Sequence, residues 1–414
     1  MLASLALRNL FRNRRRTMLS LVVVSVGVLS LLLTLGFIRY SFVGLSEALI
    51  NGGLAHLEVT PAGPATSGGN PMLDRSGQPP SFSGWQEVRD RLDRRPGVRA
   101  TGAAIQLAGV LMNGDRSVAF LGAAVEPGRQ RRMGIEVKLR GGSPLPDEAP
   151  AVGDEPVLLG VDLARALGVG IGDLVVAMVG TSTGSLNAVD LTVAGLFTTG
   201  LQDLDARIAQ LHLTTAQRLV GTDNVTSLLV SLEDRAATAS TAEAIRTEVA
   251  GRAEPLAVLD WEARAPFYRQ VRGLYIGIFV VLGTIIGLLV TLSTSNTLQM
   301  SVLERIREFG VLIAMGTDRW LIARLIVLEA IWLALIGGLV GCALTGVAVW
   351  TITIAGIQMP PPPAAVDPLT LSVVLLPIDL IGACVFMIVL LTIATVPPIL
   401  RILRLTVVEA LGHV

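Results

Sequence analysis

Lysine is almost absent from this chain. Among its 33 basic residues, Lys138 is the only lysine. The nucleotide-binding loop of a P-loop ATPase needs a lysine in the pattern Gly-x-x-x-x-Gly-Lys-Ser/Thr, where it contacts the phosphates. Lys138 lies between Val137 and Leu139, outside any such pattern. The chain therefore cannot supply a P-loop ATPase site of its own.

Cysteine and histidine are also scarce. Cys342 and Cys384 are the two cysteines, and both lie in apolar stretches, which argues against a disulfide framework. The three histidines, His56, His212 and His413, are far apart in the sequence, so no metal-binding cluster is visible. Because the formal net charge is zero, the composition predicts no binding to nucleic acid.

Charged residues make up only 16% of the chain, against about 25% in ordinary soluble proteins. The deficit is concentrated in four apolar runs, at residues 18–38, 273–303, 330–353 and 380–400. A helix of about 21 residues reaches about 31 Å, which is close to the thickness of one hydrocarbon core. The sequence therefore predicts an α-helical membrane protein with four transmembrane helices and a large mixed α/β extracytoplasmic domain inserted between helices 1 and 2.

Arginines at the ends of these runs predict the orientation. Five arginines lie between residues 8 and 16, just before the first span, and place both termini in the cytoplasm. Arg264, Arg269 and Arg272 oppose this orientation, but long translocated domains largely escape the rule. The first span is too long for a signal peptide, and no small-residue cleavage site follows it.

The predicted boundaries follow from these spans and their orientation. They are an interfacial helix at 1–16, the first span at 17–44, the α/β domain at 45–265, the second span at 266–298, a cytoplasmic helix at 299–320, the third span at 321–354, an outer loop at 355–376, the fourth span at 377–400 and a cytoplasmic tail at 401–414. The first 16 residues have helical periodicity, with apolar Ala3, Ala6, Leu7 and Leu10 opposite Ser4, Arg8 and Arg12. The alternative is a frayed basic tail that only sets the topology.

The segment 45–265 combines strand and helix patterns. Strands are predicted at 117–125, 174–179, 188–197 and 227–232, and around Leu57 and Val59; helices are predicted at 162–167 and 237–250, and around Trp85, Val88 and Leu92. The glycine-rich stretch 168–173 could suggest a phosphate loop. Because a strand rather than a helix is predicted after it, a turn between helix and strand is the better interpretation.

Polar and small residues also occur within the apolar runs. Glu329 lies one or two helical turns into the third span and is predicted as an intramembrane acid, with Arg324 as a candidate partner; the alternative is an interfacial side chain that reaches water. Asp379 is predicted to be a solvated helix start. Glycine pairs with small-xxx-small spacing allow close helix packing, either within one subunit or between two. These are Gly283 and Gly287 in the second span, and Gly337 and Gly341 in the third.

The most distinctive stretch lies between the second and third spans. Its charges can pair at i,i+3 spacing, Glu304 with Arg307 and Arg305 with Glu308, as on an exposed helix. Two glycines, Gly310 and Gly316, are expected to bend or end it. The pattern Glu-Arg-x-Arg-Glu-x-Gly-x-x-x-Ala-x-Gly resembles the coupling segment of MacB/FtsX-type ABC transporter permeases. The resemblance assigns contact with an ATPase to Glu304, Arg305, Arg307, Glu308, Gly310, Ala314 and Gly316.

Other parts of the chain carry the same resemblance. Residues 95–98, 158–164 and 167–173 are similar to the two lobes of the family's outer domain, and Val193–Phe197 with Thr199, Gly200 and Asp205 is most similar to permeases of the LolC/LolE lipoprotein-release group. Pro397 and the run Glu409-Ala410-Leu411 match the family's C-terminus. Val407 departs from it, because the family often has proline there.

The resemblance implies a permease subunit in the bacterial inner membrane that transmits ATPase-driven motion to a periplasmic domain. Its expected partners are a dimer of separate ABC ATPase subunits, a second permease that is identical or homologous, membrane lipids, and an extracytoplasmic substrate for which a lipoprotein is one candidate. No cofactor is expected in this chain, and ATP and Mg²⁺ would belong to the ATPase. MacB itself differs, since it carries its ATPase in the same chain.

Two other functions are considered. One is an FtsX-like signalling subunit that regulates an extracytoplasmic cell-wall enzyme, although proteins of that kind usually have a much smaller outer domain. The other is a membrane-anchored enzyme, for which the sequence offers no nucleophile–base pair and no metal-ligand spacing.

Overall fold

The structure, a computed structural model, describes residues 2–12, 14–63, 79–200, 202–252, 254–359 and 369–404. These residues belong to two compact units. Unit 1 comprises Met1–Val43, Arg272–Met359 and Thr370–Val414, and unit 2 comprises Gly44–Val271 and Pro360–Leu369. The middle of the predicted outer loop and the C-terminal positions Val407 and Glu409 to Leu411 lie outside the described residues.

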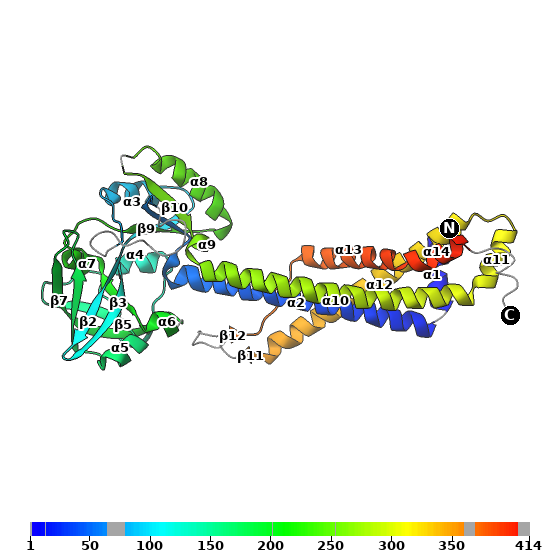
Figure 1. The fold of residues 1–414 in the computed structure, drawn as a ribbon, viewed down its shortest axis with the longest axis horizontal. Coiled ribbons are helices and arrows are strands. Elements are labelled where there is room, and N and C mark those ends of the chain that lie inside the picture. The colour runs from blue at the N-terminus through cyan, green and yellow to red at the C-terminus, as the bar shows by residue number, and fades with distance from the viewer. Residues whose placement is uncertain are drawn as a thin grey trace. The chain divides into compact units, whose positions relative to one another are not determined.

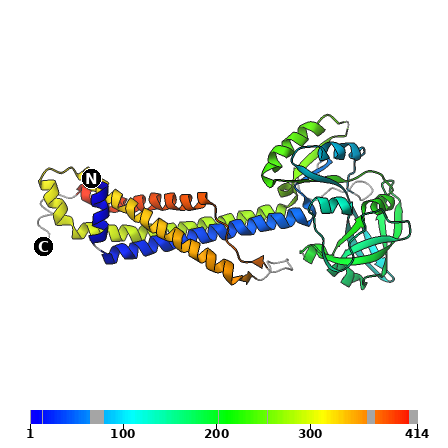
Figure 2. The same cartoon turned by 180° about the vertical axis from the view of Figure 1, so that it is seen from behind.

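Unit 1 is helical (Figures 1 and 2). It contains α1 (Leu2–Arg12), most of α2 (Arg14–Leu49) and of α10 (Pro266–Glu304), and α11 (Ile306–Ala314), α12 (Arg319–Ala355), α13 (Pro377–Ala394) and α14 (Val396–Arg404). Two short strands, β11 (Gln358–Met359) and β12 (Leu369–Thr370), pair with each other. Within the described residues, four helical stretches are long and apolar enough to cross a membrane: Arg14–Leu54, Pro266–Glu304, Arg319–Ala355 and Pro377–Arg404. They contain the four predicted apolar runs.

Two glycines of α12 allow α2 to pack closely against it. A β-carbon at Gly337 would lie 2.7 Å from Val24 Cγ1, and one at Gly341 would lie 2.6 Å from Val28 Cβ. Contacts this short leave no room for a side chain. Ser25 Oγ also donates a hydrogen bond to the carbonyl oxygen of Gly337, at 3.0 Å. Both glycines therefore serve packing within one chain.

Asp379 is buried at the start of α13. Its carboxylate accepts two hydrogen bonds from the Arg39 guanidinium of α2, at 2.6 and 2.9 Å, and one from the backbone N–H of Leu376, at 2.9 Å. The Asp379 side chain is only 7% exposed. The prediction of a helix start is confirmed, but the prediction of a solvated side chain is wrong, because an arginine from the opposite end of the chain compensates its charge.

Unit 2 is built on one ten-stranded sheet. Its strands are β1 (Leu57–Pro61), β2 (Val98–Asn113), β3 (Arg116–Val125), β4 (Lys138–Gly142), β5 (Glu155–Gly160), β6 (Leu174–Gly180), β7 (Leu186–Thr198), β8 (Ile208–His212), β9 (Ser227–Leu232) and β10 (Leu256–Asp260). They follow the order β10-β1-β9-β2-β3-β8-β5-β7-β4, and β6 pairs with both β2 and β7. The pairs β3/β8 and β5/β7 are parallel, so the sheet is mixed.

Short helices connect and cover these strands. They are a π-helical turn (Ile50–Leu54), α3 (Trp85–Asp93), α4 (Pro127–Arg132), α5 (Val161–Leu167), α6 (Gln202–Asp205), α7 (Leu213–Val220), a 3₁₀ turn (Arg235–Ala237), α8 (Thr238–Val249) and α9 (Trp261–Arg264). The predicted strands and helices of this region are confirmed, with shifts of one or two residues at some ends. In α3, Trp85, Val88 and Leu92 are buried on one face, as their spacing predicts.

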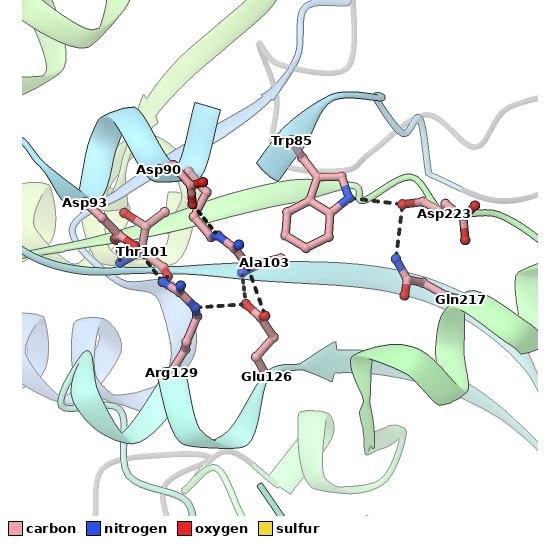
Figure 3. Close-up of polar contacts among 10 residues, drawn as sticks. Trp85, Asp90, Asp93, Thr101, Ala103, Glu126, Arg129, Gln217 and Asp223 are labelled. Atoms are coloured by element: carbon pink, nitrogen blue, oxygen red, sulfur yellow. Dashed lines mark hydrogen bonds and ion pairs between the residues drawn. The ribbon is translucent and has the colours of Figure 1, made fainter. Parts of the chain in front are cut away.

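An ionic network joins α3 and α4 to β2 (Figure 3). Arg129 of α4 pairs with Asp93 at 2.6 Å and donates to the carbonyl oxygen of Thr101 at 2.9 Å. Glu126, just before α4, accepts a hydrogen bond from the backbone N–H of Ala103 at 3.1 Å. These charged side chains thus satisfy polar groups of the longest strand in the sheet, which is a structural task.

The other end of α3 is held by Trp85 (Figure 3). Its indole N–H donates to the carbonyl oxygen of Asp223 at 3.0 Å, and Gln217 of α7 donates to the same oxygen at 3.1 Å. The Arg89 guanidinium lies 5.0 Å from the centre of the Trp85 ring, a cation–π distance. α3 is therefore held to β2 at its C-terminal end and to the loop after α7 at its N-terminal end.

Candidate functional site

The charged segment predicted as one helix at 299–320 is divided in the structure. α10 continues through Glu304, and α11 begins at Ile306. Between them, Arg305 has φ −104° and ψ 13°, which departs from helical geometry. Residues 304–306 therefore form a corner, and α11 leads away from it as a separate short helix.

The side chain of Arg305 holds this corner against α12. Its Nη1 lies 3.1 Å from Glu329 Oε1 and its Nε lies 3.3 Å from Glu308 Oε2, while its guanidinium lies 5.0 Å from the centre of the Phe309 ring. Asn9 Nδ2 of α1 donates to the same Glu329 oxygen at 2.9 Å. One buried carboxylate thus connects α1, the corner and α12.

Glu329 is 8% exposed, which contradicts the alternative of an interfacial side chain that reaches water. Its ion-pair partner is Arg305 where the sequence suggests Arg324, because the corner brings Arg305 to the side of α12. Of the two pairs predicted within the charged segment, the one between Arg305 and Glu308 is confirmed. Glu304 lies 2.7 Å from Arg16 Nη2 of α2, so a second ion pair holds the corner to another helix.

α11 has one buried face and one exposed face. Phe309 is buried in an apolar cluster with Val302 of α10, Ile322 and Ile326 of α12, and Ile402 of α14. The exposed residues of α11 and of its C-terminal end are Arg307, Glu308, Val311, Ala314 and Met315. Charged and large apolar side chains thus lie side by side on one surface, a composition suited to binding another protein.

The glycines of this segment have different roles. Gly310 lies inside α11 and is buried beside Phe309, so the prediction that it bends or ends the segment is wrong. The bend falls at Arg305. Gly316 has φ +90° and lies just after α11, where a left-handed conformation ends a helix at little cost. Its predicted role as a terminator is confirmed.

The glycines of the second span have looser surroundings. A β-carbon at Gly287 would lie 3.4 Å from Leu390 Cδ1, and one at Gly283 would lie 3.7 Å from Leu31 Cδ2, which are ordinary contact distances. These positions tolerate a larger side chain within the chain, in contrast to Gly337 and Gly341.

Sequence reasoning missed several residues of the site. Asn9 of α1 contacts Glu329, and Arg16 of α2 contacts the corner at Glu304. Both residues lie in the segment 1–16, which the sequence predicts as an interfacial helix or a frayed basic tail, so it predicts neither contact. Val311 of α11 and Met315, the residue just after it, are exposed at i,i+4 spacing. That spacing on a charged helix could have been recognised as an apolar stripe.

The family-like motifs of unit 2 have structural roles. Residues 168–173 form the predicted turn between α5 and β6, in which Gly168 has φ +70° and the Gly170 N–H donates to Asp173 at 2.7 Å. Asp205 is buried and accepts hydrogen bonds from the backbone N–H and hydroxyl of Thr199, at 2.7 and 2.6 Å. It thereby closes the loop that follows β7.

Two protein-family models match the chain. The MacB-like periplasmic core domain matches residues 17–248, and the FtsX-like permease C-terminal domain matches residues 277–407. The first of these covers more than half of the chain, and the second contains the corner and α11.

Individual relatives agree with the family models. The lipoprotein-releasing system transmembrane protein LolC of Xylella fastidiosa is 24% identical over 267 residues, 61% of this chain and 62% of LolC. The macrolide export ATP-binding/permease protein MacB of Nitrobacter winogradskyi is 30% identical over 206 residues, 47% of this chain and 30% of MacB. The extracellular domain of the transporter YknZ from Gram-positive bacteria is 15% identical, covers 50% of this chain and 98% of that domain, and has a TM-score of 0.34.

The chain spans about 62% of the length of the LolC relative. Four apolar helices, a large α/β unit and two adjoining family matches lead to one assignment. The chain belongs to the MacB/FtsX/LolC-type family of ABC transporter permeases.

Proposed function

We propose that this chain is the permease subunit of an ABC transporter that passes ATPase-driven motion to unit 2, where a substrate is exported or released. The observation that carries the proposal is the buried Glu329 carboxylate, which ties the corner before α11 to α12 and α1. In this proposal both termini are cytoplasmic, and unit 2 is an extracytoplasmic domain inserted between the first and second transmembrane helices.

ATP hydrolysis is assigned to a separate subunit. The chain has no Gly-x-x-x-x-Gly-Lys-Ser/Thr pattern, so ATP and Mg²⁺ would bind to a partner ATPase dimer. The surface proposed to meet that partner is the exposed face of α11. Its charges, Arg307 and Glu308, would orient the contact, and the apolar side chains Val311 and Met315 would be desolvated in it.

The corner is suited to transmit a push because ion pairs hold it to α12 and α2, and the Arg305–Glu329 pair has little solvent exposure. A displacement of α11 would pull on the Arg305–Glu329 and Arg16–Glu304 ion pairs. These pairs would pass the displacement on to α12 and α2. α10 is a single helix of 39 residues, so a displacement of its cytoplasmic end would reach its far end with little bending. The proposed transmission element is therefore α10 with the corner.

The proposed substrate is a lipoprotein or another lipid-like molecule. The support is the similarity to LolC, a protein of a lipoprotein-releasing system, together with the size of unit 2, whose MacB-like match extends over residues 17–248. A domain of this size favours transport over an FtsX-like signalling role. The corresponding location is the bacterial inner membrane.

A second permease, identical or homologous, is also proposed. The space beside Gly337 and Gly341 is occupied by α2 of the same chain. In contrast, a β-carbon at Gly273 or Gly277 of α10 would meet nothing within 4 Å. This small-xxx-small pair is therefore available to a helix from another subunit.

Copurification tests the proposal. The full chain, tagged and extracted from its native membranes, is expected to bring down a P-loop ATPase and lipid-modified proteins, identified by mass spectrometry. Val311→Glu and Met315→Glu should each lower recovery of the ATPase about tenfold or more, because each places a charge in the proposed contact without touching its ion pairs. Val152→Glu, at an exposed apolar site in unit 2, is the matched control and should have no effect.

Two outcomes would contradict the proposal. ATPase recovery that is equal in the α11 variants and the wild type would exclude α11 as the docking surface. Recovery of a cell-wall hydrolase in place of lipid-modified proteins would favour the signalling function.

A further inference from the structure

The two cysteines of the chain meet in unit 1. Cys342 lies on α12 and Cys384 on α13, and 42 positions separate them in the sequence. Their sulfur atoms are 3.9 Å apart, and both thiols are free and half-buried. Since the chain has only two cysteines, this contact uses every thiol that it contains.

A glycine brings the two helices close at this point. Gly338 lies one helical turn before Cys342, and a β-carbon there would be 3.2 Å from Cys384 Sγ and 4.0 Å from its Cα. The absence of a side chain at Gly338 therefore lets α13 approach α12 closely. The thiols lie beside that approach, so rotation about their side-chain bonds can change the distance between the sulfur atoms without separating the helices.

We propose that Cys342 and Cys384 form a redox modification site, at which a hydroperoxide converts the two thiols into an intramolecular disulfide. The inference rests on the thiol geometry and is independent of the proposed transport function. It predicts a reversible covalent link between α12 and α13 within one subunit.

The chemistry proceeds in two balanced steps. One thiol attacks the terminal oxygen of the hydroperoxide: an S–O bond forms, the O–O bond breaks, and the thiol proton passes to the leaving oxygen, which gives a sulfenic acid and an alcohol (or water). The second thiol then attacks the sulfenic sulfur: an S–S bond forms, the S–O bond breaks, and the hydroxide leaves as water with the proton of the second thiol. The two thiols together lose two electrons and two protons, and the hydroperoxide accepts them. A neighbouring thiol at 3.9 Å captures the sulfenic acid before a second oxidation can occur.

The surroundings select the class of oxidant. Ile381 and Val385, which flank Cys384 on α13, are exposed apolar residues of a helix long and apolar enough to cross a membrane. A neutral hydroperoxide that partitions into an apolar phase can reach the pair, whereas a charged oxidant would have to be desolvated first. Cumene hydroperoxide is therefore the probe of choice, with hydrogen peroxide as a small polar comparison.

The experiment uses the full chain in lipid bilayers. After treatment with cumene hydroperoxide, the protein is denatured, alkylated with a maleimide and weighed intact by mass spectrometry. We expect the untreated protein to carry two maleimide adducts and the oxidised protein none, with a mass lower by two hydrogen atoms. A thiol reductant should restore both adducts, and peptide mapping should show Cys342 linked to Cys384.

A shifted thiol supplies the matched control. The variant Cys384→Ser with Val385→Cys keeps two thiols but moves one of them about 100° around α13, onto an exposed position. It should retain both free thiols, or link different chains, under conditions that fully oxidise the wild type. The proposal is overturned if the wild type keeps two alkylatable thiols, if its sulfurs gain oxygen atoms without linking, or if the shifted variant forms the intramolecular link at the same rate.

Discussion

The carboxylate of Glu329 receives hydrogen bonds from two elements that are distant in the sequence, Asn9 of α1 and Arg305 at the corner. Glu329→Gln keeps an acceptor oxygen for Asn9 but removes the negative charge that compensates Arg305. Because both charged side chains have little solvent exposure, we expect the unfolding free energy to fall by about 1–3 kcal/mol. Denaturant unfolding of the full chain in detergent micelles measures this loss.

A double-mutant cycle with Arg305→Gln separates the ion pair from other effects of each substitution. If the pair is real, the double variant should be more stable than the sum of the two single losses predicts. Additive losses would show that Glu329 and Arg305 do not interact. Asn9→Ala in the same cycle reports whether α1 depends on the same carboxylate.

The imidazole of His56 makes the stability of unit 2 depend on pH, with a sign that follows from its pKa. Burial lowers the pKa of His56 below its ordinary 6.5, and Arg235 and Arg99 lower this pKa further. His56 Nδ1 accepts a hydrogen bond from the Leu232 N–H at 3.2 Å, which requires the neutral ring. Below pH about 6.5 the His56 imidazole becomes protonated in the unfolded chain, whereas in the folded chain it stays neutral until the pH reaches its lowered pKa. Stability should therefore be complete above that pH and fall as the pH drops toward the folded-state pKa.

Thermal melting at pH 7.5 and pH 5.5 tests this dependence. The melting temperature should be lower at pH 5.5, and His56→Gln should reduce the difference, since glutamine accepts the same hydrogen bond without titrating. Burial also lowers the pKa of His212. His212 should therefore account for the difference in melting temperature that remains in the His56→Gln variant, with the same sign. A melting temperature that rises on acidification would contradict the assignment for both side chains.

At the scale of elements, the close contact between α2 and α12 requires the absence of a β-carbon at Gly341, as it does at Gly337. Gly341→Ala would place a methyl group 2.6 Å from Val28 Cβ and 2.9 Å from the Ser25 carbonyl oxygen. The two helices must then separate, and we expect a loss of about 1–3 kcal/mol in unfolding free energy. Gly346→Ala, on the same helix with nothing within 4 Å, is the control and should be neutral or stabilising by up to about 1 kcal/mol. Equal effects of the two substitutions would refute the packing argument.

Sequence periodicity predicted most elements but not the places where distant residues meet. The four apolar helices follow from composition alone, because a membrane-crossing helix must satisfy its backbone internally. The corner at Arg305 has no glycine or proline to mark it, and its partner Glu329 lies 24 positions further along the chain. The prediction of a solvated Asp379 is wrong for the same reason, since its partner Arg39 lies 340 positions away. Such pairings depend on tertiary packing, which no local pattern encodes.

The strand β2 shows the same limit within unit 2. It pairs with β3, β6 and β9, and it is the longest strand of the sheet. Its first half, Val-Arg-Ala-Thr-Gly-Ala-Ala, is rich in alanine and glycine, which have weak strand preference in isolation. Several of these small residues are buried where neighbouring elements approach closely. Small side chains here serve packing, so propensity gives a misleading signal.

At the scale of the whole molecule, the charges around the apolar helices bear on orientation. Arg264 counts against a cytoplasmic N-terminus when the sequence is considered alone. In the structure its Nε lies 2.5 Å from Glu58 Oε2, and it donates to the Leu54 carbonyl oxygen at 2.6 Å. Burial lowers the pKa of Arg264, and the neighbouring carboxylate of Glu58 opposes this shift. Its charge is thus compensated inside unit 2, which removes one objection to the proposed topology.

Accessibility of single cysteines tests that topology in sealed spheroplasts. In a background with Cys342→Ser and Cys384→Ser, one thiol is introduced at Val152 of unit 2 or at Met315 after α11. Both positions are strongly exposed, 82% and 69%, so a difference in labelling reports the side of the membrane rather than burial. A membrane-impermeant maleimide should label the Val152→Cys protein in spheroplasts and the Met315→Cys protein only after permeabilisation. Labelling of Met315→Cys in sealed spheroplasts would place α11 outside, where no ATP-driven partner could reach it, and the proposed coupling would fail with the topology.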